Sequence, residues 1–118
     1  MAFYEYRRVT PPSLPPSTLF GKRLREARLR AGLPQDKLGV AIGIDEGAAS
    51  ARISRYEAGV HEPPASIANR LAQVLGVLPP YLYCEDDDLA AVILTWGKLP
   101  VSERLRASNF ILGLSTPN

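Results

Sequence analysis

Few side chains in this sequence could carry out covalent or metal chemistry. Cys84 is the only cysteine and His61 the only histidine among the 118 residues. A single cysteine and a single histidine complete neither a disulfide framework nor a metal cluster with the usual number of ligands. A triad of Ser54, His61 and a carboxylate is formally possible, but no nucleophile elbow or strand framework supports it. We therefore expect no enzyme activity, no catalytic residue, no metal and no cofactor.

Charged side chains suggest binding rather than catalysis. Residues 1–62 carry ten Lys and Arg against seven Asp and Glu, whereas residues 63–118 carry four against five. The basic excess centres on GKRLREARLR, a cluster that suits phosphate binding, although a basic helix face is often simply solvated. The acidic run EDDD lacks partner carboxylates at the spacing of a metal-binding loop. It is interpreted as a helix start, where negative charge is favourable.

The sequence shows no signal for export or for membrane insertion. No apolar run approaches the roughly 20 residues that span a bilayer. The first residues, MAFYEYRRVTPP, lack the apolar stretch of a secretory signal. The absence of a disulfide framework also fits a reducing compartment. We expect a soluble cytoplasmic protein.

The elements that must position these side chains are predicted to be helices. The eleven prolines stand near the N-terminus and at a few later boundaries, while Leu, Ala and Arg dominate the rest. Apolar residues recur every three or four positions from Leu19 to Ala31, and Gly32 closes this first helix. Further helices are predicted from Pro34 to Gly43, from Asp45 to Gly59, from Ala65 to Leu75, over LAAVILTWGK and after Pro100, with a helical turn at PPYLYC. The predicted class is all-α.

Three stretches of these helices carry a family resemblance. LREARLRAGLPQDKLGVAIG, ISRYEAG and LAQVLGV resemble the Cro and phage-repressor type of helix-turn-helix domain, or XRE family, over about residues 18–83. The resemblance implies a five-helix repressor-like DNA-binding domain, here followed by two C-terminal helices. The positions that match the family's order are Gln35, Leu38, Gly43, Ile44, Ile53, Ser54, Glu57 and Gly59.

Each matching position has a physical reason. Gln35, at the start of the second helix, can donate from its amide to a DNA phosphate. Gly43 permits a left-handed backbone in the turn. Ile44 closes the turn onto the core, and Ile53 anchors the third helix from below. In the family an arginine at the place of Arg28 pairs with the glutamate at Glu57, so the resemblance implies a structural ion pair between these residues.

The sequence departs from the family pattern at two places. Gly39 stands where the family has a small residue such as alanine, at a cost to the helix of about 1 kcal/mol. Between Ile44 and Ile53 the family leaves four residues, whereas this sequence has eight. Four extra residues amount to about 400° of helix and return each side chain to within about 40° of its former direction. We therefore predict one added N-terminal turn after an Asp45 cap; the alternative is a loop over residues 45–49 with Ser50 starting the helix.

The resemblance also implies which side chains contact DNA. In the family the first turns of the third helix enter the major groove. Arginine can pair with guanine, serine can donate or accept, and an alanine methyl can touch thymine. The leading candidates for base contact are Arg52 and Arg55, for which phosphate contact or plain solvation is the alternative. His61 is either an exposed loop residue or a phosphate contact. The full predicted set is Gln35, Ser50, Ala51, Arg52, Ser54, Arg55 and His61.

The two ends of the chain are assigned by their composition. Residues 1–17 are rich in proline and are predicted to form an extended or disordered arm, with DNA contact or packing on a partner chain as alternatives. Residues 18–83 would bind DNA. Residues 84–118 offer two apolar surfaces that a small domain cannot bury, so we predict a homodimer contact there. Its predicted residues are Leu89, Val92, Ile93, Trp96, Phe110 and Ile111.

These patterns predict a sequence-specific transcriptional regulator, expected to be a repressor, that binds double-stranded DNA as a homodimer on an inverted repeat. The rival hypothesis is an antitoxin or protein-interaction module. In that case the C-terminal helices would bind a small protein partner, and DNA binding would serve autoregulation.

Overall fold

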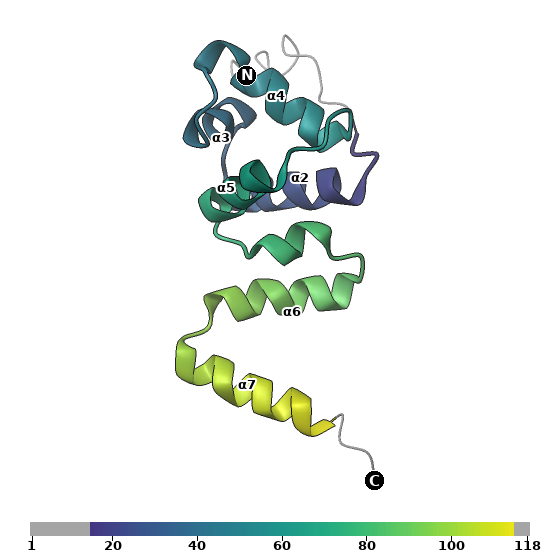
Figure 1. Ribbon diagram of the computed structural model, residues 1–118, viewed down its shortest axis with the longest axis vertical. Helices are drawn as coiled ribbons and strands as arrows, with labels where there is room; N and C mark the ends of the chain where they lie inside the picture. Colours follow the sequence, from purple (N-terminus) through teal and green to yellow (C-terminus); the bar gives the residue numbers. More distant parts are fainter. Residues whose placement is uncertain (1–14, 115–118) are drawn as a thin grey trace, which may run out of the picture.

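The computed structural model describes residues 15–114, and every regular element among them is a helix (Figure 1). This result confirms the predicted all-α class. Of the predicted N-terminal arm, residues 1–14 lie outside the described residues. None of the helices between residues 15 and 114 combines the length and the apolar composition of a membrane span. The elements in chain order are α2 (Leu19–Ala31), α3 (Gln35–Ala41), α4 (Glu46–Ala58), α5 (Ala65–Leu75), the 3₁₀-helix η1 (Pro79–Tyr83), α6 (Asp87–Lys98) and α7 (Val101–Leu114).

Local sequence signals account for the helix boundaries. Side-chain oxygens cap three N-termini: Thr18 accepts from the N–H of Gly21, Asp45 from Gly47 and Asp86 from Leu89. Helices α2, α4 and α5 each end at a glycine with positive φ. The second helix was expected to reach Gly43 but ends at Ala41, because the chain already turns there and Gly43 adopts a φ of 97°.

The hydrophobic core lies between helices α2, α3, α4, α5 and η1. Its largest fully buried apolar side chains are Leu24, Leu38, Ile53, Leu71, Tyr81 and Leu82. Burying one such side chain contributes about 1.5 to 3 kcal/mol. Because residues from all five elements meet in this core, it fixes the orientation of α3 and α4 relative to the rest of the chain.

Helix α6 is anchored to this core. Ala90 is buried, and Ile93 and Leu94 pack partly against the core cluster. The buried guanidinium of Arg23 on α2 donates to the carbonyl oxygen of Cys84 at 2.9 and 2.7 Å and to the carboxylate of Asp87 at 2.9 Å. Burial lowers the pKa of Arg23, but the hydrogen bond and charge of Asp87 outweigh it and place that pKa above its usual value. Arg23 therefore stays charged and holds the start of α6 on α2.

Helix α7 behaves differently from α6. None of its residues is buried. Figure 1 shows it beyond α6, at the end of the molecule opposite to α3 and α4. The two C-terminal helices thus differ in how firmly they are attached, although the sequence pattern gave no reason to separate them.

Candidate nucleic-acid interface

Of the eight residues between Ile44 and Ile53, Asp45 caps helix α4 and the other seven belong to it. The helix begins at Glu46, and the side chain of Asp45 accepts a hydrogen bond from the N–H of Gly47 at 3.2 Å. The prediction of one added N-terminal turn is confirmed, and the alternative of a loop over residues 45–49 is wrong. The added turn therefore extends the end of α4 for which the family resemblance implied DNA contact.

The added turn explains the glycine at position 39. Ala49 is fully buried on the inner face of α4 and faces Gly39 on α3. A Cβ at position 39 would lie 2.5 Å from the Cβ of Ala49 and 2.8 Å from its Cα. The two departures from the family pattern are thus one structural feature, because the longer α4 crosses α3 where only glycine leaves room.

Replacing Gly39 by alanine is therefore expected to destabilise the protein, although alanine is the better helix former. Helix propensity alone favours the change by about 1 kcal/mol. Overpacking of a close contact costs about 1 to 3 kcal/mol, and here the Cβ would meet backbone atoms that cannot rotate away. Urea unfolding of Gly39→Ala should show a lower free energy of unfolding than the original chain.

The matched control is Gly97→Ala. Gly97 also lies inside a helix, but a Cβ there would meet only the side chain of Leu78, at 3.5 Å, an ordinary contact. This variant should be neutral or slightly more stable. If Gly39→Ala were as stable as Gly97→Ala, the close contact between α3 and α4 would not constrain position 39.

A buried carboxylate joins the three helices of this region. Glu57 on α4 is fully buried. Arg28 on α2 donates to it from Nε at 2.5 Å and from Nη2 at 3.2 Å. Arg25 donates from its Nε at 3.2 Å, and Gln35, at the start of α3, from its Nε2 at 3.1 Å. We call these four residues the Glu57 cluster. It locks α4 to α2 and α3 from the side opposite to its exposed face.

The sequence predicted three of the four members of the Glu57 cluster. The ion pair that the family resemblance implied joins Arg28 and Glu57. Gln35, predicted to contact a phosphate, uses one amide hydrogen on Glu57; an amide nitrogen carries two, so a second hydrogen remains for another acceptor. Arg25 was missed, although it stands three residues before Arg28 and therefore shares its helix face.

Five of the seven predicted DNA-contacting residues lie on α4, on the solvent-facing part that we call its outer face. Ser50, Ala51, Arg52 and Arg55 are exposed, and Ser54 is half-buried. Within residues 15–114, neither Arg52 nor Arg55 forms an ion pair or a side-chain hydrogen bond with another residue. Their guanidinium groups are therefore available to an external acceptor such as a base edge or a phosphate.

The first turn of α4 has the opposite charge. Asp45 and Glu46 are exposed carboxylates at the N-terminus, where they interact favourably with the helix dipole. They also make this helix end unsuitable for a phosphate. Carboxylates can accept from the amino group of cytosine. The exposed surface of α4 therefore has carboxylate acceptors at its N-terminal end and arginine donors in its second and third turns.

Two further polar side chains lie near the two ends of α4. His61 is exposed in the segment after α4. Arg70 on α5 was not predicted; its Nη1 donates to the carbonyl oxygen of Ile42 at 3.4 Å, beside the turn between α3 and α4. It was missed because only the tertiary packing of α5 brings it to this turn.

Comparison with known proteins also identifies a helix-turn-helix domain in this part of the chain. The model of a helix-turn-helix domain family matches residues 19–81. A crystal structure entitled "transcriptional regulator BswR" is 42% identical to the chain, with a TM-score of 0.75, and the match covers 79% of this chain and 92% of that one. No curated protein matches the chain.

Proposed function

Because the chain belongs to the helix-turn-helix domain family, we propose that it is a sequence-specific DNA-binding transcriptional regulator that places α4 in the major groove. The observation that carries the proposal is the contrast between the two sides of α4. The inner side is held by the buried Glu57 cluster, whereas the outer side presents Arg52 and Arg55 without partners among the described residues. A rigid helix with available guanidinium groups is suited to reading base edges.

The similarity to a protein entitled as a transcriptional regulator supports the same proposal, since the match covers most of both chains. In this proposal residues 18–83 bind DNA and residues 84–118 pair two copies. In this proposal the protein represses transcription by occupying its DNA site. Such repression requires only DNA binding and the pairing of two copies of the chain.

Pairing on an inverted repeat is proposed because one helix reads too few base pairs for useful specificity. The surface proposed for it lies on α6 and α7. Leu89 and Val92 on α6 are exposed, as are Phe110 and Ile111 on α7. The two remaining predicted contacts are less accessible: Trp96 is half-buried, and Ile93 is half-buried and packs against the core.

The proposal is tested first by selecting bound sequences from random double-stranded DNA. On the selected site, Arg55→Ala is expected to cost about 1 to 3 kcal/mol of binding free energy and to relax the preference at one base position. Gln35→Ala should weaken binding to all sites nearly equally, because a phosphate contact carries no sequence information. Fluorescence anisotropy with the selected site and its single-base variants measures both effects.

The control is Arg30→Ala, which removes the same charge from α2 beside Tyr81, away from α4. It should leave base preference unchanged. Equal behaviour of Arg55→Ala and Gln35→Ala would refute the assignment of Arg55 to base reading, and failure to select any sequence would refute DNA recognition itself.

A further inference from the structure

Helix α7 has apolar side chains on two separate faces. At 100° per residue, Val101, Leu105 and Leu112 share one side, which we call the outer face. Both Val101 (81% exposed) and Leu105 (63%) are open to solvent. Phe110, Ile111 and Leu114 lie on another side and are also exposed. A helix that is apolar on more than one face is normally covered on more than one side.

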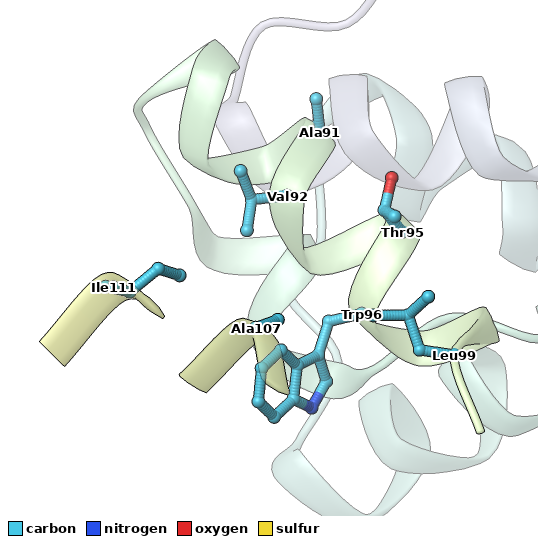
Figure 2. Close-up of a pocket in the computed structure, with 7 residues that line it drawn as sticks. All are labelled: Ala91, Val92, Thr95, Trp96, Leu99, Ala107 and Ile111. Carbon is cyan, nitrogen blue, oxygen red and sulfur yellow. The ribbon is translucent and has the colours of Figure 1, made fainter. Parts of the chain in front are cut away.

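Helix α6 faces only one of these sides. Between α6 and α7 lies an apolar groove of about 270 Å³, to which α7 contributes Ala107 and Ile111. Figure 2 shows the indole of Trp96 extending from α6 towards Ala107, with Val92 on the side of Ile111. None of the outer-face residues lines this groove. The remaining lining residues are Ala91, Thr95 and Leu99.

The charges on α7 are confined to its first half. Arg106 pairs with Glu103 at 2.8 Å, and Arg104 donates to the carbonyl oxygens of Trp96 and Gly97 at 3.0 and 3.3 Å. The last eight described residues, 107–114, contain no charged side chain. An uncharged apolar surface fits a second apolar surface of the same kind better than it fits an acidic or basic partner or a nucleic acid.

The size of the surface fits a second copy of this chain. Helices α6 and α7 have 12 and 14 residues, and a standard protein interface uses about 20 to 30 residues on each side. A two-fold contact makes the same patch serve both copies, so each groove can receive the α7 of the other. Such an exchange covers the outer face of α7 and, on its other apolar side, Ile111 in the groove.

We propose that α7 folds together with dimerisation, with the outer face of each α7 packed into the α6–α7 groove of a second copy. The inference rests on the homodimer of the proposed function, and it adds which surfaces meet and what pairing does to the chain. An isolated helix of about 14 residues is marginal in water, and no residue of α7 is buried in one copy. Below the dimer dissociation constant, α7 is therefore unfolded and DNA binding by the pair is lost.

The experiment compares glutamate variants at two sites of nearly equal exposure and at a third site on the groove wall. Leu105, on the outer face of α7, is 63% exposed, and Leu29, on α2, is 62% exposed. At tens of micromolar, the original chain and Leu29→Glu should sediment as dimers with residues 101–114 protected from hydrogen exchange. Leu105→Glu should sediment as a monomer in which residues 101–114 exchange at least tenfold faster while α2 to α5 stay protected. Val92→Glu, on the groove wall, should give the same result.

Three outcomes would overturn the proposal: a dimeric Leu105→Glu, a monomeric Leu105→Glu with α7 still protected, or a monomeric original chain. Binding of each variant to a single half-site is measured in parallel. If the dimer proposal fails but the variants still bind the half-site, the proposed DNA recognition stands. If the original chain itself does not bind the half-site, the DNA-binding proposal fails independently of the dimer.

Discussion

Replacing Glu57 by alanine is expected to lower the free energy of unfolding by about 3 to 5 kcal/mol, the cost of removing one partner from a buried ion pair. The carboxylate is fully buried and accepts from Arg25, Arg28 and Gln35. Without it, the buried guanidinium of Arg28 keeps its charge but loses its counter-ion. Chemical denaturation followed by circular dichroism measures the loss.

The exposed pair on α7 provides a control with the same residue types. Glu103 accepts from Arg106 at 2.8 Å, and their side chains are 44% and 77% exposed. Because water and salt screen such a pair, Glu103→Ala should change stability by at most about 1 kcal/mol. Similar losses of unfolding free energy for Glu57→Ala and Glu103→Ala would show that burial of the Glu57 cluster adds nothing to stability.

A conservative variant separates charge from shape. Glu57→Gln keeps the volume of the side chain and one oxygen that can accept a hydrogen bond, but it removes the negative charge. Its stability should lie between those of the original chain and Glu57→Ala. Its DNA affinity should fall less than that of Glu57→Ala, because α4 would still be held close to its position against α2 and α3.

The helices could be predicted from the sequence because their boundaries are set locally. A cap such as Asp45 and a terminator such as Gly59 act within one turn of the helix they bound. The extra turn of α4 was predicted on the same basis. Helical periodicity alone places Ala51, Arg52, Ser54 and Arg55 about 100° or more from the buried Ile53, so the sequence could predict that these α4 residues face away from the core.

Contacts between distant segments could not be predicted in this way. Gly39 and Ala49 are ten positions apart on different helices, and their near contact depends on how closely α3 and α4 cross. Arg70 reaches the turn after α3 only through the packing of α5. The different attachment of α6 and α7 depends on Arg23 and Ala90, whose partners lie far away in the sequence. Periodicity carries no information about such pairings.

Because α6 is anchored to the core and α7 is not, the pairing of two chains can be tested by removing α7 alone. A chain ending at Leu99 keeps α6, whose Ala90 is buried and whose Asp87 binds Arg23, and it removes α7, which buries no residue. We expect a folded monomer with an unchanged core. Linking two DNA-binding units increases overall affinity by about 10²- to 10⁴-fold through effective concentration. The affinity of the truncated chain for the full inverted repeat should therefore be lower than that of the original chain by a factor in that range.

Binding to a single half-site should be the same for both chains, because α3 and α4 are intact in each and only one copy contacts the DNA. Titrating the full repeat and the half-site with each chain gives the ratio of the two chains' affinities for each DNA, and these two ratios test the prediction. If the truncated chain still sediments as a dimer, or keeps its full preference for the repeat over the half-site, pairing does not depend on α7. The surface that sets the spacing of the two α4 helices would then lie on the helices that remain.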